Sequence, residues 1–434
     1  MYIRRHLEPV IMRASETFPA VMVTGPRQVG KTTMLERLAD PSRICVSLDS
    51  PINREMAKND PGLFLQRYQP PVLIDEFQYA KELLPFIKTY VDKHKRNGDF
   101  WLTGSQMFHM MAQVSESLAG RVAIVPMQGL SSGEIMGMTK AVGMQEAARE
   151  QETPRASESI RMPGAVETPS AAFRADPNEW VARLKTRQPM SLMQVYERIF
   201  KGSMPRVYSE RPDREMFYGS YVDTYLRRDI RDITQVGDEL AFLRLITACA
   251  ARTGQKVTYT ELARDAGVSP PTAKQWLSIL VTSGIIVLVE PYFNNTLTRI
   301  VKSPKMYFMD TGLCAYLTRW DSAKTLEASM MSGAIFETYV VSEIIKSYYN
   351  AGKRPPVFYY RDTDQKEIDL IVEVGDTLHP FEIKKSAAPG KDSIRHFHVL
   401  GKTKKEIGAG GVICMADSVY PVDDKNYYIP AWLI

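Results

Sequence analysis

Residues 20–33, AVMVTGPRQVGKTT, constrain the fold of this chain more than any other part of its sequence. An apolar run over residues 20–23 leads into the pattern G-x-x-x-x-G-K-[ST], and a helix-compatible segment follows over residues 34–39. A phosphate-binding loop forms in this strand–loop–helix context. Its two glycines let the backbone close around a polyphosphate, so that N–H groups and the helix N-terminus point at its oxygens. The sequence therefore predicts a nucleoside triphosphate site.

The predicted site combines this loop with a later pair of acids. Lys31 is expected to reach the β- and γ-phosphates of ATP, and the Thr32 hydroxyl to ligate Mg²⁺. An apolar strand, PVLIDE, ends on Asp75 and Glu76. We expect Asp75 to hold Mg²⁺ and Glu76 to orient or deprotonate the attacking water. The residues expected to bind ATP are Gly25, Pro26, Arg27, Gln28, Val29, Gly30, Lys31, Thr32 and Thr33.

Two further segments suggest residues that act on the nucleotide. The strand-like stretch DFWLTGSQ ends in small polar residues, among them Ser105 and Gln106. These could contact the γ-phosphate or only form a turn. Arg121 directly precedes another apolar strand. It could neutralise transition-state charge on ATP held by a neighbouring subunit, or be a solvated residue at the start of a strand.

The segments GPRQVGKTT, LIDEFQ, LTGSQ and SLAGRV occur in this order. Together with Leu48-Asp49 they resemble the prokaryotic AAA+-type P-loop ATPases in which a C-terminal domain of unknown function follows the ATPase. The resemblance covers most of residues 1–136 and continues later in the chain. It implies an ATPase that uses ATP and Mg²⁺ and forms a homo-oligomer. It also implies that Ser105 senses the γ-phosphate.

Composition limits the remaining possibilities. A chain of 434 residues with 44% hydrophobic content predicts about three packed domains. No apolar run reaches membrane-spanning length, and charges at Arg4, Arg5 and Glu8 rule out a secretory leader, so we expect a cytoplasmic protein without a membrane partner. The four cysteines lie far apart and indicate neither disulfides nor a zinc site. A net charge of +5 permits nucleic-acid binding but does not argue for it.

Residues beyond the ATPase segment change in character. Residues 138–190 are rich in Ala, Glu, Ser and Pro, which predicts a flexible insert, although a short partner-binding helix is an alternative. Helical periodicity then predicts a connector over residues 191–235. Its end, YLRRDIRDI, clusters Arg227, Arg228 and Arg231 near two aspartates. These arginines could form local ion pairs or contact phosphates.

Residues 236–320 carry the pattern of a winged helix-turn-helix. Ser269 precedes two prolines, as expected at the start of a helix, and Gly284 is expected to end that helix before a β wing. In a DNA reader, Pro271, Thr272, Lys274 and Gln275 would face the major groove. Only one of these side chains is basic, whereas phosphate contacts need several. The alternative is a packing or lid element.

Residues 321–434 resemble the restriction-endonuclease-like PD-(D/E)xK fold. Glu337 lies in a predicted helix, and Asp369 and Glu382 lie in successive predicted strands. The resemblance implies that these acids hold Mg²⁺ and that Lys384 activates or orients water. Ile368 stands where the motif has proline. The alternative is a scaffold that binds or docks without cutting.

The sequence thus predicts an α/β protein. Its expected parts are an AAA+ P-loop ATPase domain (1–137), an insert (138–190), a helical connector (191–235), a winged-helix domain (236–320) and a PD-(D/E)xK nuclease-like domain (321–434). The leading hypothesis is an oligomeric ATPase that couples ATP hydrolysis to DNA or RNA binding or processing. The alternative is an ATP-dependent signalling or scaffold protein whose C-terminal domain docks a protein partner.

Overall fold

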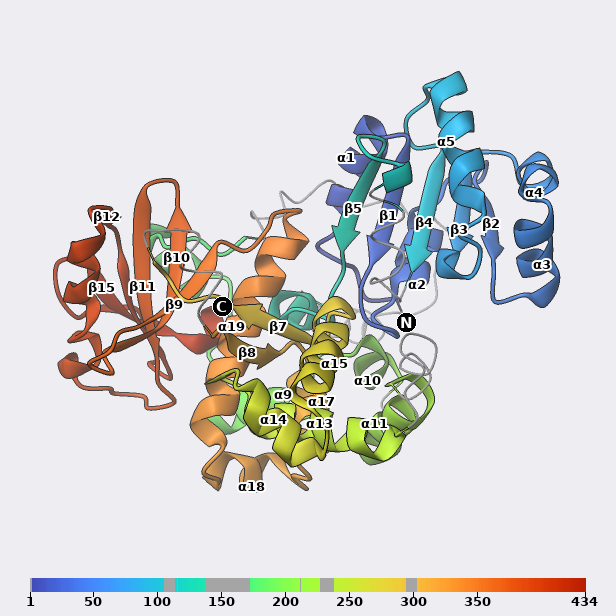
Figure 1. Cartoon of the computed structure of the whole chain (residues 1–434). Coiled ribbons are helices and arrows are strands. Elements are labelled where there is room, and N and C mark those ends of the chain that lie inside the picture. Colours follow the sequence, from blue (N-terminus) through green and yellow to red (C-terminus); the bar gives the residue numbers. More distant parts are fainter. Residues whose placement is uncertain are drawn as a thin grey trace, which may run out of the picture.

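The computed structural model describes residues 2–104, 114, 116–137, 172–210, 212–226, 238–293 and 303–434. Figure 1 shows a parallel sheet near the N-terminal (blue) end, a larger sheet near the C-terminal (red) end, and helices around a small sheet between them. Several residues singled out in the sequence lie outside the described residues, namely Ser105, Gln106, Arg227, Arg228 and Arg231.

The N-terminal sheet is parallel, with the order β2-β3-β4-β1-β5. Its strands are β1 (Ala20–Thr24), β2 (Ile44–Ser47), β3 (Val72–Asp75), β4 (Phe100–Gly104) and β5 (Val122–Pro126). The helical elements are α1 (Glu8–Thr17), α2 (Lys31–Leu38), α3 (Pro51–Asn59), α4 (Pro61–Arg67), η1 (Phe77–Tyr79) and α5 (Leu83–His94). Every residue of β1 and β4 is buried, because a parallel sheet is covered on both faces.

The strand order determines where the predicted site residues meet. β4 lies between β1 and β3, so the carboxyl ends of these three strands adjoin at one edge of the sheet. The loop of residues 25–30 follows β1, and Asp75 ends β3. Ligands of open parallel sheets bind at this edge. The mixed α/β arrangement with its parallel sheet fits a P-loop NTPase.

Part of the predicted flexible insert is folded. Helix α8 (Pro177–Leu184) lies within it, and Trp180 and Phe173 are buried in the large hydrophobic core. The prediction of a mobile segment was therefore wrong for residues 172–190, because these two aromatic rings supply the apolar area that the rest of the insert lacks. The connector helices follow as α9 (Leu192–Lys201), α10 (Pro205–Ser209), α11 (Arg214–Tyr221) and η2 (Val222–Leu226).

The next module builds its small sheet from strands far apart in sequence. Its elements run α13 (Glu239–Ala251), β6 (Gln255–Lys256), α14 (Tyr259–Ala266), α15 (Pro270–Thr282), β7 (Ile286–Val289) and β8 (Lys305–Phe308), and the sheet order is β6-β8-β7. Ser269 caps α15 by accepting a hydrogen bond from the Thr272 N–H, as its sequence position indicates. Helices α17 (Thr311–Leu317) and α18 (Ala323–Ala328) lead onward.

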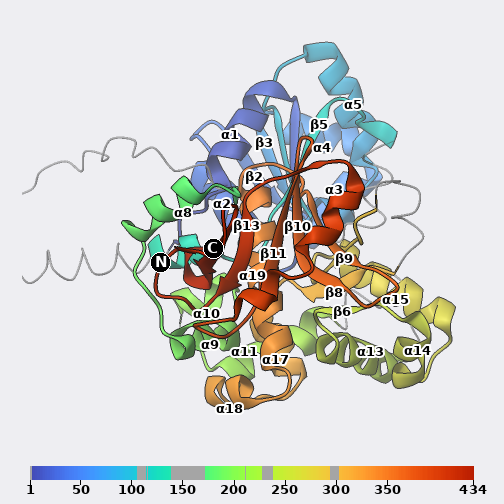
Figure 2. The same ribbon diagram turned by 90° about the vertical axis from the view of Figure 1, so that its left-hand side faces the viewer.

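The C-terminal module packs the long helix α19 (Ser332–Asn350) against a mixed sheet, as Figure 2 shows. The strands are β9 (Val357–Arg361), β10 (Glu367–Val374), β11 (Thr377–Ile383), β12 (Glu406–Ile407), β13 (Gly410–Cys414), β14 (Tyr420–Pro421) and β15 (Asn426–Pro430). The 3-10 helices are η3 (Lys391–Ile394), η4 (Phe397–Thr403) and η5 (Ala431–Leu433). β9, β10 and β11 are antiparallel, whereas β11, β13 and β15 are parallel.

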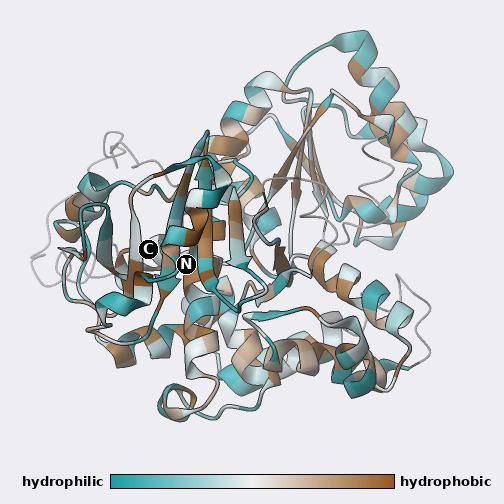
Figure 3. Cartoon of the chain, turned by 60° about the vertical axis from the view of Figure 1, so that its left-hand side comes forward, coloured by the Kyte–Doolittle hydropathy of each residue, from teal (hydrophilic) through white to brown (hydrophobic). Residues whose placement is uncertain are grey.

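One large hydrophobic core joins all of these modules. It runs from Leu7 beside the first sheet, through Ile246 and Leu280 of the middle module, to Trp432 in η5. Figure 3 shows apolar strands and helix faces meeting at the centre of the molecule. Because the core is shared, a change at one module can reach the others by packing.

Candidate functional site

The loop after β1 has the backbone of a phosphate cradle. Gly25 and Gly30 have φ angles of +146° and +90°, which residues with a side chain rarely adopt. A Cβ on Gly25 would overlap the main-chain oxygen of Met127, whereas a Cβ on Gly30 would meet nothing within 4 Å. Gly25 is therefore required by close packing, and Gly30 by the turn that starts α2.

Lys31 lies over this loop. Its side chain is buried, and Nζ donates hydrogen bonds to the carbonyl oxygens of Gly25 (3.0 Å) and Pro26 (2.8 Å). The ammonium is thus held at the loop that the sequence predicts to surround phosphate.

The Thr32 hydroxyl meets Asp75 across the sheet edge. Its Oγ1 donates to Asp75 Oδ1 at 2.5 Å, and Ser47 Oγ donates to the other carboxylate oxygen at 3.3 Å. Hydroxyl and carboxylate oxygens are the hard ligands that Mg²⁺ prefers. The chemistry of these donors fits the ion that the sequence predicts here.

Thr103, near the end of β4, supports both acids of the site. Its hydroxyl donates to Asp75 Oδ1 at 2.5 Å and accepts a hydrogen bond from the Glu76 N–H at 3.1 Å. Glu76 follows β3 in the left-handed region, with φ of 54°, and its carboxylate accepts a hydrogen bond from Gln78 Nε2. The sequence analysis missed Thr103, although its position next to the end of a strand in LTGSQ was a signal.

Arg5 forms a second support beneath the loop. Its guanidinium is buried and donates to the carbonyl oxygens of Val29 and Gln128, both at 2.7 Å, and to Glu134 Oε1 at 3.1 Å. Burial alone would raise the pKa of Glu134, but the Arg5 charge and nearby donors hold that pKa below its ordinary value. Arg5 thus ties the segments that precede and follow the parallel sheet in sequence to the loop.

Arg121 lies where the strands of the parallel sheet begin, at the end of the sheet opposite the loop. It precedes β5, whose first residue pairs with Ala20 at the start of β1. Five strand residues separate this edge from the loop, about 17 Å at 3.3 Å per residue. Arg121 instead forms an ion pair with Asp92, with Nε 2.5 Å from Oδ1. It does not join the site formed by the loop of its own chain.

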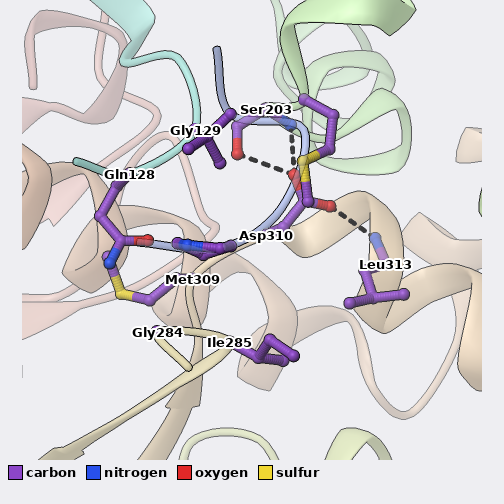
Figure 4. A pocket seen from close by; sticks show the side chains of 11 residues that line it. Gln128, Gly129, Ser203, Gly284, Ile285, Met309, Asp310 and Leu313 are labelled. Atoms are coloured by element: carbon purple, nitrogen blue, oxygen red, sulfur yellow. Dashed lines mark hydrogen bonds between the residues drawn. The ribbon is translucent and has the colours of Figure 1, made fainter. Parts of the chain in front are cut away.

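A narrow pocket lies between the loop and the modules that follow. Pro26 and Val29 line it on the ATPase side, and Figure 4 shows Gly284, Met309 and Asp310 on the other side. Asp310 is fixed there because it accepts hydrogen bonds from the N–H groups of Ser203 and Leu313. A Cβ on Gly284 would lie 3.1 Å from Pro26 Cδ and 3.0 Å from Gln128 Nε2. The loop therefore abuts the junction between α15 and β7.

The predicted acids of the C-terminal module do come together. Lys384 Nζ lies 3.0 Å from Glu382 Oε2 and 3.5 Å from Asp369 Oδ2. Burial raises the pKa of Glu382, and the Asp369 charge raises it further, to about 9. Burial also acts to raise the pKa of Asp369, but the charges of Lys305 and Lys384 lower it overall. Of these two carboxyl groups, Glu382 is therefore the one that keeps a proton more readily.

Glu337 joins this cluster through a residue that the sequence analysis missed. Lys305 Nζ, from β8, lies 3.1 Å from Glu337 Oε1, 2.7 Å from Glu367 Oε1 and 3.9 Å from Asp369 Oδ1. Burial raises the pKa of Glu337 to about 7, with Asp369 adding to the rise. Across the described residues, no three His, Cys, Asp or Glu side chains are placed to hold one metal ion.

The face of α15 that would enter a DNA groove is open in part. Pro271, Lys274 and Gln275 are exposed, whereas Thr272 is half-buried and bonds to the capping Ser269. The segment after β7, which would form the wing, pairs within the chain instead, because residues 290–292 bond to Tyr359 of β9. Among the helices described, none combines the length and apolarity needed to cross a membrane.

Models of known domains match three successive parts of the chain. Residues 17–136 match an AAA domain, residues 193–324 a domain of unknown function (DUF8612), and residues 332–434 another domain of unknown function (DUF4143). The AAA match and the geometry of the loop support an ATP-binding P-loop ATPase with a DUF4143-type C-terminal domain.

Relatives extend the likeness over nearly the whole chain. The "Uncharacterized protein Rv2008c" of Mycobacterium tuberculosis and the "Uncharacterized protein Mb2031c" of Mycobacterium bovis are each 26% identical over 432 residues, covering 99% of this chain and 83% of the relative. Among solved structures, the Walker-type ATPase PABY2304 of Pyrococcus abyssi is 16% identical, with a TM-score of 0.41, covering 73% of this chain and 96% of that one. A STAND protein, PH0952 of Pyrococcus horikoshii, is 12% identical, with a TM-score of 0.26, covering 81% and 48%.

Proposed function

We propose that this chain binds and hydrolyses ATP at the carboxyl edge of its parallel sheet and transmits the nucleotide state to the modules that follow. The contact between Thr32 and Asp75 carries this proposal, because it places two Mg²⁺-type ligands beside the P-loop lysine. Thr32 and Asp75 would hold the ion. When bound, Mg²⁺ would neutralise charge on the phosphates.

The side chains around that contact have distinct roles in the proposal. Lys31 would exchange its contacts with the loop carbonyls for phosphate oxygens. Glu76 would orient the attacking water or accept its proton. Thr103 would fix both acids by its two hydrogen bonds. Ser105 remains the proposed γ-phosphate sensor.

Contact between the loop and the middle module supports transmission of the nucleotide state. Pro26 and Gln128 both lie against Gly284, with little space between them. Arg5 joins the loop carbonyl of Val29 to the segment after β5. A change in loop conformation on binding ATP would therefore press on α15 and β7.

We propose that the chain works as a homo-oligomer in which Arg121 serves the nucleotide of a neighbouring copy. Its position at the far edge of the sheet supports this role, because a residue there could approach another subunit. The ion pair with Asp92 would hold the guanidinium until such a neighbour docks.

The output of the ATPase is best explained as docking of a protein partner by the C-terminal module. It is preferred to DNA binding because residues 290–292 pair with Tyr359, so this backbone of the proposed wing is already bonded within the chain. Nucleic-acid binding through a winged helix is the second candidate, favoured by the exposed Lys274 and Gln275 and by the strand order β6-β8-β7.

Substitution of Glu76 tests the proposed hydrolysis directly. Glu76→Gln should still bind ATP but turn it over about 100-fold more slowly, because general-base assistance contributes factors of this size. Glu55→Gln, on the exposed face of α3, is the matched control and should behave as wild type. Steady-state phosphate release measures both. Undiminished turnover by Glu76→Gln would contradict its proposed role.

A further inference from the structure

Lys305 crosses from the middle module into the acid cluster of the C-terminal module. It is the first residue of β8, and its side chain is almost fully buried. Its ammonium contacts carboxylates from two elements: Glu337 of α19 at 3.1 Å, and Glu367 and Asp369 of β10 at 2.7 and 3.9 Å. The single Lys305 ammonium thus lies among carboxylate oxygens of Glu337, Glu367 and Asp369.

Two of these acids are the ones expected to bind Mg²⁺ in a nuclease-like site. Glu337 Oε1 accepts hydrogen bonds from both Lys305 Nζ and the Tyr307 hydroxyl, at 3.1 and 2.7 Å. Asp369 Oδ2 accepts hydrogen bonds from the Ile383 N–H and from Lys384. One oxygen of each carboxylate, Glu337 Oε1 and Asp369 Oδ2, therefore already accepts two hydrogen bonds from this chain. With the Lys305 ammonium beside both acids, the residues do not fit a metal ion between them.

Cations of this chain meet the acids of the cluster where a metal would otherwise do so. Lys305 Nζ contacts Glu337, Glu367 and Asp369. Lys384 Nζ lies 3.5 Å from Asp369 Oδ2, and Arg361 Nη1 lies 2.9 Å from Glu367 Oε2. A divalent ion placed among these cations in a buried site would be repelled by them, which is costly.

β8 holds the ammonium in place. It is the central strand of its sheet and pairs with β6 and with β7. Its other residues, Met306, Tyr307 and Phe308, are fully buried. Withdrawing Lys305 would therefore require breaking strand pairing and core packing together.

We propose that Lys305 is the resident cation of this cluster and takes the position that a divalent metal would occupy. The C-terminal module is accordingly a metal-free unit clamped to β8, and it does not cleave phosphodiesters through these acids. The clamp joins the module that abuts the P-loop to the module that carries the acids.

Binding of Mn²⁺ alone to the nucleotide-free full chain tests the proposal. Free Mn²⁺ can be followed by electron paramagnetic resonance. Wild type and Asp369→Asn should bind the same number of ions. Lys305→Met should gain one ion per chain, and adding Asp369→Asn to that variant should remove it. Lys385→Met, which loses a lysine bonded instead to Glu327, should gain none.

Two results would overturn the proposal. One is an ion bound by wild type that Asp369→Asn loses, because the cluster would then hold a metal beside Lys305. The other is a folded Lys305→Met protein that gains no ion. If Lys305→Met does not fold, the comparison of wild type with Asp369→Asn decides alone, since equal binding supports the resident ammonium and unequal binding refutes it.

Discussion

At the scale of single residues, uncharged and cationic side chains determine what the acids of this protein can do. Thr103 positions Asp75 and Glu76 by one hydroxyl that donates to the first and accepts from the second. Lys305 neutralises acids in the C-terminal module. The acids of the two sites therefore have different neighbours. Asp75 accepts hydrogen bonds from hydroxyl groups, whereas Glu337 and Glu367 contact the Lys305 ammonium.

The protonated Glu382 should make stability depend on pH. Its pKa in the folded protein is about 9 against an ordinary value of 4.5, so folding retains a proton that the unfolded chain releases. The free energy of unfolding should therefore fall as the pH rises from about 4.5 to about 9. Glu382→Gln should remove the part of this slope that Glu382 contributes and be about 1 kcal/mol more stable than wild type near pH 8.

Urea denaturation of both proteins near pH 5 and near pH 8 measures this difference. Glu373→Gln, at a half-buried position in the same sheet, serves as a control that keeps the Glu382 proton. A wild-type stability that rises over this range, with the same rise in Glu382→Gln, would show that Glu382 is ionised in the folded protein.

At the scale of elements, the end of α15 is the contact through which the loop meets the middle module. Gly284 ends α15 with φ of +74°, and Gly267 ends α14 with φ of +73°. Of the two, only Gly284 lies against the nucleotide loop, through Pro26, whereas a Cβ on Gly267 would approach only the Arg244 guanidinium. The two glycines have nearly the same φ but different neighbours.

This pair separates a stability effect from a coupling effect. Gly284→Ala and Gly267→Ala should each lower the free energy of unfolding by about 1 kcal/mol, because alanine is strained at positive φ. Only Gly284→Ala should also change the KM for ATP, by several-fold. Steady-state ATPase assays and thermal unfolding measure both variants. Equal ATPase kinetics in the two variants would argue against transmission through this contact.

At the scale of the whole molecule, the shared core places the parallel sheet and the C-terminal sheet on one framework. The segment after β5 contributes to this connection, because the Ser132 N–H donates to Glu343 of α19 at 2.6 Å and Lys346 donates to the Leu130 carbonyl at 3.2 Å. ATPase and C-terminal module are therefore joined directly as well as through the connector.

Action of Arg121 on a neighbouring copy has a specific signature in mixtures. Arg121→Ala should lower turnover at least about 10-fold, since such arginines supply large factors. Mixing it with Lys31→Ala should restore part of the activity, because an intact P-loop then meets an intact arginine from another chain. Asp92→Ala, which removes only the ion-pair partner, is the control. Full activity of Arg121→Ala alone would show that no arginine finger acts here.

The sequence predicts those features that depend on local spacing. The P-loop, the strand ending at Asp75 and the cap at Ser269 each lie within a short stretch whose chemistry is readable by itself. Thr103 was missed because its role depends on β4 lying between β1 and β3. Lys305 was missed because it belongs to one module and acts in another. Arg5 was missed because two of its partners, Gln128 and Glu134, lie more than a hundred residues further along the chain.

Titration of the protein with ATP by calorimetry tests the central claim most directly. Wild type should show one saturable site that requires Mg²⁺, and Lys31→Ala should bind at least about 10-fold more weakly because it loses a phosphate contact. Lys93→Ala, on the exposed surface of α5, should bind as wild type does. Binding that is absent in wild type, or unchanged in Lys31→Ala, would contradict a nucleotide site at this loop.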